Sequence, residues 1–177
     1  MIFQELEIAG VYLITPVKNE DERGFFARTF CEREFREIGL CTSFVQCNLS
    51  YNAKKGTLRG MHYQAAPYEE VKIVSCPKGA IYDVALDVRS NSPTFGKWIS
   101  RELNEDNHEM LYLPKGIAHG FQTLEDDTLV YYQIGAYYEP KAARGIRYDD
   151  PRYAIQWPFE EKILSNRDKE HPVGVSV

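Results

Sequence analysis

Hydrophobic and aromatic residues occur along this 177-residue chain in short runs separated by Gly, Pro, Asn or Asp. The runs recur at intervals of about ten residues, which is typical of successive short β-strands. They read GVYLITP, SFVQCNLSYN, GTLRGMHYQ, VKIVSC, AIYDVALDVR, KWISREL, EMLYLP, AHGFQTL and TLVYYQIGAYY. This spacing indicates a sandwich or barrel rather than alternating β and α units. The pattern therefore predicts a mainly all-β fold, with one domain over residues 1–177.

Three segments add to this pattern. EDERGFFARTF predicts a turn at residues 23–24 followed by β-prone aromatic residues. EREFREIG predicts a helix, because Phe35 and Ile38 are three residues apart and Gly39 is a natural stop. Residues 145–172 predict loops and a short helix packed over the barrel.

The stretch EVKIVSCPKGAIYDVALDV predicts a hairpin, with its turn at residues 77–79. Counting back from the turn sets Lys72 nearly opposite Asp83, and alternation gives Lys72 the same face as Val74 and Cys76. Two interpretations of Lys72 follow. It forms a solvent-facing ion pair with Asp83, which contributes little stability, or it lies inside the barrel and stabilises negative charge on a substrate oxygen.

Composition and charge narrow the function classes. The chain is 44% hydrophobic and 27% charged, with a net charge of −5 and a pI near 5.4. Because Lys and Arg form no basic run, nucleic-acid binding is not expected, and an anionic ligand needs a few local arginines. The chain shows no signal peptide or apolar stretch of membrane-spanning length, and its cysteines lack CxxC spacing, so we expect a cytoplasmic protein with reduced thiols. These cysteines are Cys31, Cys41, Cys47 and Cys76.

The segment LPKGIAHGF contains a match to PxGxxH, the second half of the cupin pattern, in which His119 is the histidine. The first half of that pattern supplies His-x-His and a glutamate, which bind a metal together with the later histidine. Here the first pair reads His62-Tyr63-Gln64, so one imidazole ligand is missing even if Glu69 or Glu70 contributes. The shortfall favours a metal-free barrel in which a histidine acts as a base.

If His62 acts as a base, it requires an acid that orients its ring. The candidates are Asp83, Asp87 and Asp168, and their spacing in the sequence does not choose between them. Arg59 and His62 are three residues apart, so strict strand alternation would send them to opposite faces. Both enter one pocket only if the strand bulges between them, and Gly60 permits this.

The segment TLVYYQIGAYYEP carries four tyrosines within eight residues. Tyr132 and Tyr138 are an even number of residues apart, so they can share a face. Aromatic packing explains most such tyrosines. The alternative is that one phenol serves as a proton donor inside the pocket.

The chain resembles the dTDP-4-dehydrorhamnose 3,5-epimerase family over residues 10–169. The matching segments occur in the family's order and read DERGFF, FVQCNLS, GTLRGMHYQ, SPTFGKW, LPKGIAHGF, YYEP, YDDP, IQWP and LSNRDK. The resemblance implies a cupin-like jelly roll that works as a homodimer without a metal or organic cofactor. It also implies inversion of the carbons beside the ketone of a nucleotide-linked 4-keto-6-deoxy sugar, with a dTDP-sugar as the expected substrate.

The resemblance also assigns roles to residues. His62 corresponds to the catalytic base, Asp168 to its acidic partner and Tyr132 to the tyrosine that protonates the opposite face. Lys72 and Arg59 match positions around the keto oxygen and the diphosphate. Further expected substrate-binding residues are Gln46, Asn48, His119, Tyr138, Asp83, Phe26 and Arg23, the last reaching the nucleotide in the partner subunit.

Arg28 and Cys47 depart from the family pattern near the motifs for the nucleotide end, where Glu and Asp are usual. The sequence therefore leaves open which nucleotide is bound, and also whether C3, C5 or both are inverted. A metal-dependent cupin enzyme that uses His62 and His119, and a non-catalytic sugar-nucleotide binding module, are the competing hypotheses.

Overall fold

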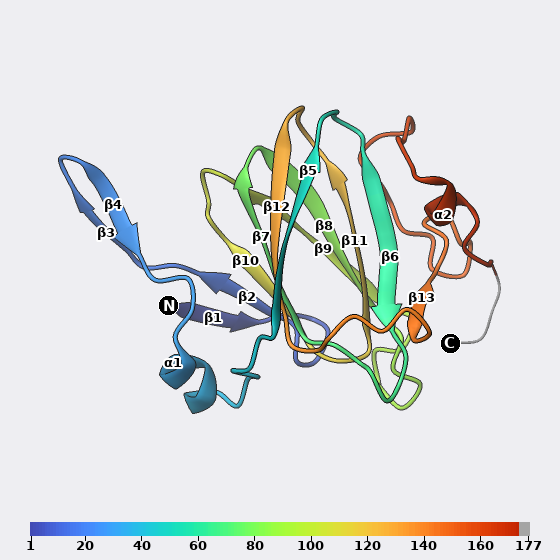
Figure 1. Ribbon diagram of the computed structural model, residues 1–177, viewed down its shortest axis with the longest axis horizontal. Helices are drawn as coiled ribbons and strands as arrows, with labels where there is room; N and C mark the ends of the chain where they lie inside the picture. The colour runs from blue at the N-terminus through green and yellow to red at the C-terminus, as the bar shows by residue number, and fades with distance from the viewer. Residues whose placement is uncertain (174–177) are drawn as a thin grey trace.

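Residues 1–173 are described by the computed structural model, in which two antiparallel β-sheets face each other (Figure 1). The six-stranded sheet comprises, in spatial order, β1 (Ile2–Glu5), β2 (Tyr12–Thr15), β10 (Met110–Leu113), β7 (Lys72–Lys78), β12 (Thr128–Ile134) and β5 (Gln46–Asn52). The five-stranded sheet comprises β13 (Ala143–Gly145), β6 (Leu58–Gln64), β11 (Ile117–Thr123), β8 (Ala80–Asp87) and β9 (Trp98–Asn104). This arrangement confirms the predicted mainly all-β, cupin-like jelly roll.

The main core fills the space between the two sheets. Alternate residues of each strand point inward, as the period of two requires. Val74 and Val130 from one sheet meet Ile81 and Phe121 from the other, and all four are at most 1% exposed.

A smaller apolar cluster covers the outer face of each sheet. Outside the five-stranded sheet, the C-terminal loops bring Ile146 and Ile155 against Met61 and Leu86. Outside the six-stranded sheet, α1 (Glu32–Glu37) buries Phe35. Both faces of each sheet are therefore buried, which explains why the central strands are apolar on both faces.

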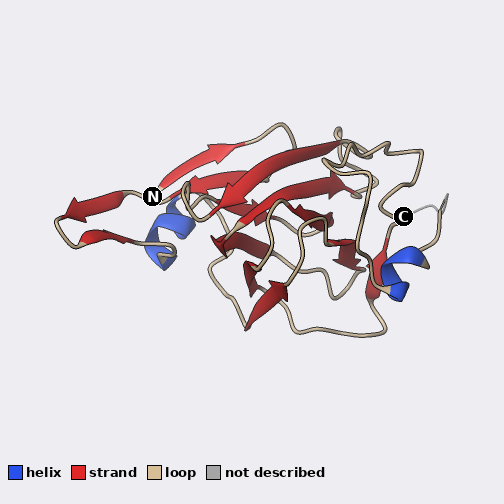
Figure 2. Cartoon of the chain, turned by 90° about the horizontal axis from the view of Figure 1, so that it is seen from above, coloured by secondary structure: helices blue, strands red, loops and turns tan. Residues whose placement is uncertain are grey.

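The hairpin of β3 (Lys18–Asp21) and β4 (Gly24–Ala27) forms an arm that projects from one side of the body, in the blue part of Figure 1 and again in Figure 2. Its position agrees with the turn predicted at residues 23–24. The predicted helix is also present as α1, and Gly39 follows its end, with its amide donating to the Arg36 carbonyl. Ile38 is 40% exposed, so only Phe35 anchors this helix.

The predicted hairpin of residues 70–88 is wrong. β7 pairs with β10 and β12, whereas β8 pairs with β9 and β11, so residues 77–79 connect the two sheets. Each strand is central in its own sheet, because the apolar residues on both of its faces need partners on both sides. The predicted alternation is correct, since Val74 and Cys76 belong to the core between the sheets.

Two short edge strands, β1 and β13, were not predicted, while the predicted C-terminal helix is α2 (Asn166–Lys169). It packs beside β6 on the right of Figure 1. Within residues 1–173, every helix is too short or too polar to cross a membrane.

Candidate active site

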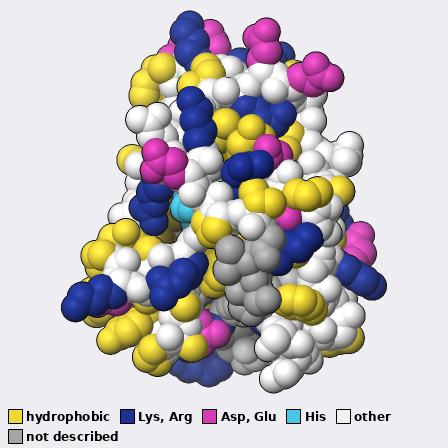
Figure 3. All heavy atoms as spheres, turned by 90° about the vertical axis from the view of Figure 1, so that its right-hand side faces the viewer, with side chains coloured by type: hydrophobic (Ala, Val, Ile, Leu, Met, Phe, Trp, Pro, Cys, Tyr) yellow, Lys and Arg dark blue, Asp and Glu magenta, His cyan; other side chains and the backbone are white. Residues whose placement is uncertain are grey.

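A cavity of about 420 Å³ opens between the two sheets. Its walls combine residues of both sheets with the α2 segment. It is lined by Gln46, Asn48, Leu49, Ser50, Arg59, His62, Glu70, Lys72, His119, Phe121, Tyr132, Ile134, Tyr138, Ser165, Arg167 and Asp168. On the face that carries α2, histidine atoms are visible between Lys and Arg side chains (Figure 3).

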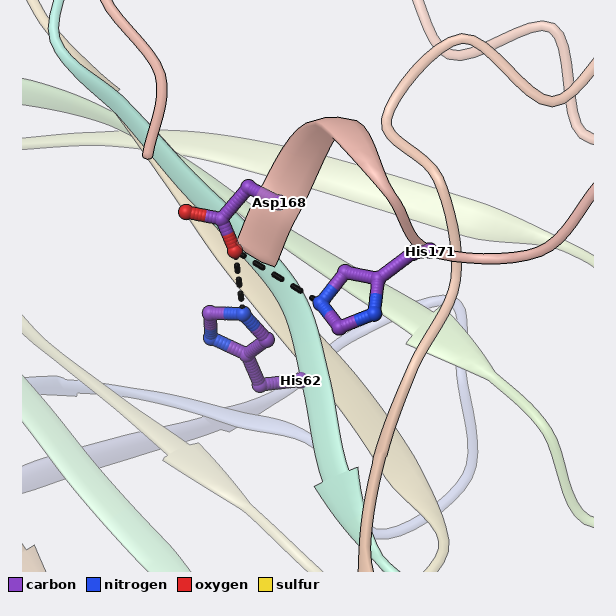
Figure 4. A group of neighbouring side chains, drawn as sticks. All are labelled: His62, Asp168 and His171. Atoms are coloured by element: carbon purple, nitrogen blue, oxygen red, sulfur yellow. Dashed lines mark hydrogen bonds and ion pairs between the residues drawn. The ribbon is translucent and has the colours of Figure 1, made fainter. Parts of the chain in front are cut away.

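A short polar contact in this cavity joins His62 on β6 to Asp168 in α2 (Figure 4). The distance from His62 Nε2 to Asp168 Oδ1 is 2.6 Å. Ser165 is the N-cap of α2: its hydroxyl accepts a hydrogen bond from the Asp168 amide and donates one to Asp168 Oδ2 at 2.7 Å. The short helix therefore fixes the carboxylate behind the imidazole ring.

The environment of Asp168 also sets the tautomer of His62. Burial raises the pKa of Asp168, but hydrogen bonds from His62 and Ser165 outweigh it and leave the pKa below its usual value. An ionised carboxylate only accepts hydrogen bonds, so His62 donates from Nε2. The lone pair of the neutral ring is then on Nδ1, which is the nitrogen able to accept a proton.

Arg59 and His62 both line the cavity, as the bulge hypothesis requires. The pairing of β6 with β11 shifts register between His119 and Phe121, opposite Gly60. Gly60 has a φ of +132°, and a Cβ there would lie 2.5 Å from the Cα of Gly120. The predicted bulge at Gly60 is confirmed, and only glycine fits it.

Arg59 reaches the cavity with its guanidinium held by neutral oxygens. Its Nε donates to Asn52 Oδ1 at 2.8 Å and its Nη2 to the Tyr51 carbonyl at 3.4 Å. These contacts orient the planar group without neutralising its charge, which suits it to bind an anion.

Tyr132 lies on the opposite wall, on β12 of the six-stranded sheet. Burial, reinforced by the nearby charge of Asp83, raises the pKa of its phenol well above the usual value. Its ring stands edge-on to His119, with the centroids 5.9 Å apart. The phenol therefore stays protonated at neutral pH and is available as a proton donor.

Lys72 is buried in the cavity wall rather than exposed on the surface. The side chain is 9% exposed, and Nζ lies 2.8 Å from Glu70 Oε1 and 3.4 Å from the His62 carbonyl. The predicted pairing with Asp83 is wrong, because β7 and β8 are in different sheets. The interpretation of Lys72 as a solvent-facing ion pair is therefore also wrong.

Asp83 supports His119 instead of facing the cavity. Its Oδ1 lies 2.7 Å from His119 Nε2, and the residue is fully buried. Burial raises its pKa although the His119 ring opposes this. Asp83 is not among the residues that line this cavity, and its role as a substrate contact stays a prediction. The acid beside His62 is Asp168, not Asp83. Asp87 is not that acid either, since it binds Arg89.

Gln46, Asn48 and Tyr138 all line the cavity. Tyr138 lies in the loop after β12, and its amide donates to Gln46 Oε1 at 2.6 Å. The exposed Cys47, at one of the two positions that depart from the family pattern, is not among the lining residues.

Arg23 and Phe26, both predicted to bind substrate, lie on the β3–β4 arm and outside the cavity of their own chain. The Arg23 side chain is 84% exposed and bonds Asp21, and Phe26 is 76% exposed. Arg28, the second departing position, pairs with Glu34 at the base of the arm. Within one protomer the structure does not bring these residues to the site.

Sequence reasoning missed several site residues. Ser165 was detectable, because a serine three residues before an aspartate is an N-capping signal. Glu70 was considered only as a metal ligand, and Arg167 lies inside a recognised motif without a predicted role. His171, whose Nε2 is 3.6 Å from Asp168 Oδ1, lies beyond the last matching motif and carried no signal.

The metal-dependent hypothesis used His62 and His119 as ligands. These residues are cross-strand neighbours. However, the Nε2 atoms of the two rings are hydrogen-bonded to different carboxylates, Asp168 and Asp83. The observed contacts therefore describe two separate His–Asp pairs rather than one shared metal site.

Comparison with known proteins agrees with this geometry. Residues 5–174 match the profile of the family described as dTDP-4-dehydrorhamnose 3,5-epimerase. The enzyme of that name from Sinorhizobium fredii is 45% identical over 173 residues, covering 97% of this chain and 89% of its own.

Solved structures give the same result. The dTDP-4-dehydrorhamnose 3,5-epimerase of Bacillus anthracis, with TDP and PPi bound, superposes with a TM-score of 0.94 at 40% identity, covering 97% of this chain and 98% of its own. ChmJ, a 3'-monoepimerase from Streptomyces bikiniensis in complex with dTDP-quinovose, superposes with a TM-score of 0.89 at 34% identity. The match covers 95% of this chain and 85% of the ChmJ chain. The chain belongs to the dTDP-4-dehydrorhamnose 3,5-epimerase family and is an isomerase.

Proposed function

We propose that the protein inverts C3, C5 or both carbons of a dTDP-linked 4-keto-6-deoxy sugar. One observation carries the proposal: a His–Asp pair and a protonated tyrosine line the same cavity from opposite sheets. Inversion next to a ketone requires removal of a proton from one face and its return on the other, so it needs a base and an acid on opposing walls.

In the first step, His62 takes the proton from the carbon beside the ketone. Nδ1 holds the free lone pair, and Asp168 stabilises the imidazolium that forms. The electrons move onto the ketone oxygen, and Lys72 stabilises the resulting enolate. Glu70 holds the Lys72 ammonium in the cavity wall, with Oε1 2.8 Å from Nζ.

In the second step, Tyr132 donates its phenol proton to the opposite face of the enolate. Its raised pKa means that the phenol is protonated when the enolate forms. The enolate is itself strongly basic, so a weak acid placed against it can transfer a proton. His119, edge-on to Tyr132 and held by Asp83, fixes the direction of the phenol.

The nucleotide end is assigned to the arginines. Arg59 offers a fork of donors to the diphosphate and is already oriented by neutral oxygens. The match to the family and the TDP in the B. anthracis relative support thymine as the base. Gln46, Asn48 and Tyr138 line the cavity and are assigned to substrate binding.

We further propose that the protein is a homodimer in which the arm reaches the partner's cavity. Arg23 and Phe26 project on the arm without contacting the cavity of their own chain. The edge strand β5 also presents Leu49 and Tyr51, which are 68% and 56% exposed. A second copy that covers β5 would bury this apolar surface and bring a second arginine toward the diphosphate.

Inversion of C3 alone is the second candidate activity, and the similarity to the 3'-monoepimerase ChmJ favours it. Both activities use the same base and acid. They differ in how many protons beside the ketone come within reach of His62.

Proton NMR of dTDP-4-keto-6-deoxyglucose in deuterated water with the enzyme tests the proposal. We expect deuterium at C3, C5 or both, and the pattern distinguishes the two candidates. The His62→Asn variant should lose exchange while still binding the nucleotide. Absence of exchange with this sugar, and with its UDP- and GDP-linked counterparts, would overturn the proposal.

A further inference from the structure

Three potential metal ligands converge behind the base. His62, Asp168 and His171 come from β6, α2 and the segment after α2, and their side chains point toward one another (Figure 4). The ligand atoms all lie within 4.8 Å of one another. The two histidines both approach the same carboxylate oxygen, at 2.6 and 3.6 Å.

His171 lies against the His62–Asp168 pair, and its ring stands edge-on to that of His62 with the centroids 5.4 Å apart. Its side chain is 11% exposed, and within residues 1–173 its buried Nε2 has no hydrogen bond. The ring packs over Gly145, where a Cβ would overlap the imidazole. The backbone of β13 therefore admits His171 to a site in which a polar nitrogen faces Asp168 without a hydrogen bond to it.

The spacing of these atoms is close to that of a tetrahedral zinc site. Zinc bonds of about 2.0–2.1 Å place neighbouring ligand atoms about 3.3 Å apart. The 2.6 and 3.6 Å distances from the two histidines to Asp168 lie on either side of that spacing. The ligand atoms of His62 and His171 are at most 4.8 Å apart. Two imidazoles and one carboxylate form a donor set that suits Zn²⁺ and leaves a fourth position for water.

We propose that His62, Asp168 and His171 bind Zn²⁺, and that this binding inhibits the enzyme. The metal site stands on geometry alone, whereas the inhibition rests on the proposed role of His62 as the base. Zn²⁺ takes the lone pair of Nε2, so the single proton of the neutral ring moves to Nδ1. The nitrogen that would accept the substrate proton then has no lone pair, and proton abstraction stops.

This mechanism differs from simple blockage of the cavity. The metal lies between the ring of His62 and α2, on the Nε2 side of the imidazole, so the sugar nucleotide can still bind. Zn²⁺ should therefore lower kcat with little change in KM. An ion that instead bridged the diphosphate would change KM.

The binding test uses Co²⁺ as a spectroscopic substitute for Zn²⁺, added to the full-length protein without an affinity tag. We expect one equivalent of Co²⁺, visible d–d absorption without thiolate charge-transfer bands, and displacement by Zn²⁺. The His171→Asn variant should weaken binding at least about tenfold. His108→Asn is the matched control and should bind as the wild type does. The proposed site would be overturned if the wild type bound no Co²⁺ or showed thiolate charge-transfer bands. It would also be overturned if His171→Asn bound Co²⁺ as tightly as the wild type.

The inhibition test measures solvent exchange of the sugar against Zn²⁺ concentration. The wild type should lose exchange as Zn²⁺ fills the site, whereas exchange by His171→Asn, expressed relative to the zinc-free rate of that variant, should resist Zn²⁺. If Co²⁺ binds as expected but saturating Zn²⁺ leaves exchange unchanged, the inhibition is wrong. If the metal-free wild type shows no exchange, the proposed function fails while the metal site is judged by its spectrum.

Discussion

At the scale of single residues, the site separates two proton-transfer groups by their environments. Hydrogen bonds keep Asp168 ionised, so it can support a charged imidazole, whereas burial keeps the Tyr132 phenol protonated. Groups whose pKa values are pushed in opposite directions can act as base partner and acid at the same pH. The chemistry thus depends on what surrounds each side chain.

We predict that Asp168→Asn lowers the rate of exchange by about 10²- to 10⁴-fold, because an amide neither stabilises the imidazolium nor fixes the Nε2–H tautomer. Initial rates of deuterium incorporation provide the measurement. Ser165→Ala is the control, since it leaves the carboxylate and removes one hydrogen bond to it, and a smaller loss is expected. A loss for Ser165→Ala equal to that of Asp168→Asn would show that placing α2, not the charge, is what matters.

The residue motifs predicted which side chains meet, but not all of their partners. His62, Lys72, Tyr132 and Asp168 were identified from the resemblance and line one cavity. The partner of Lys72 was predicted incorrectly, because contacts across sheets depend on strand pairing that local patterns do not encode. The contact of Asp83 with His119 was not predictable for the same reason, since it arises only when β8 lies beside β11.

At the scale of elements, the bulge in β6 connects backbone geometry to the site. Gly24 also has a positive φ, but a Cβ added there would meet no neighbouring atom. We predict that Gly24→Ala lowers the free energy of unfolding by about 1–3 kcal/mol, from backbone strain alone. Gly60→Ala should cost at least about 1 kcal/mol more, because its Cβ meets the backbone of β11. Chemical denaturation of both variants provides the measurement. Equal losses would contradict the claim that β6 and β11 pack too closely for a side chain.

The end of β8 gives a prediction of pH dependence. Burial raises the pKa of Asp87, but hydrogen bonds from Arg89, Ser92 and Thr94 outweigh it and lower the pKa from 3.8 to about 2. The ionised form therefore stabilises the fold above pH 4, and this contribution is lost as pH falls toward 2. Solvent near Arg89 screens part of the interaction, so ionised Asp87 contributes about 1–2 kcal/mol to the free energy of unfolding.

The measurement compares denaturation of wild type and Asp87→Asn from pH 7 to pH 2. The difference in unfolding free energy should shrink with acid. Asp149→Asn is the control, because Asp149 is exposed and pairs with Arg147 at the surface. A difference for Asp87→Asn that stays constant with pH would contradict the assigned pKa.

The strands were predictable to the extent that local composition determines them. Nine of the strands coincide with apolar runs bounded by turn residues, and the arm follows from its own turn. β1 and β13 were missed because each is short and becomes a strand only by pairing at a sheet edge. Which strands join which sheet was not predictable, since central strands of both sheets have similar apolar faces.

At the scale of the whole molecule, the arm and the exposed surface of β5 point to an assembly. We predict a dimer by sedimentation velocity. Leu49→Arg should shift the protein toward monomers, because a charge would be buried at the interface. A wild-type protein that sediments only as a monomer would contradict the proposed assembly.

The position of Arg23 can be tested by mixing inactive partners. Arg23→Ala should weaken nucleotide binding, and His62→Asn should abolish exchange. If Arg23 acts on the partner's site, a mixed dimer of the two variants contains one intact site and regains exchange. If Arg23 acts within its own chain, mixing restores nothing.

The stereochemistry of exchange in Tyr132→Phe tests the central claim most directly. The claim is that His62 removes the proton and Tyr132 returns one to the opposite face. The variant keeps the base and Lys72, so NMR in deuterated water should show deuterium entering the sugar with retained configuration and little epimer. Normal formation of the epimer by Tyr132→Phe would contradict the account.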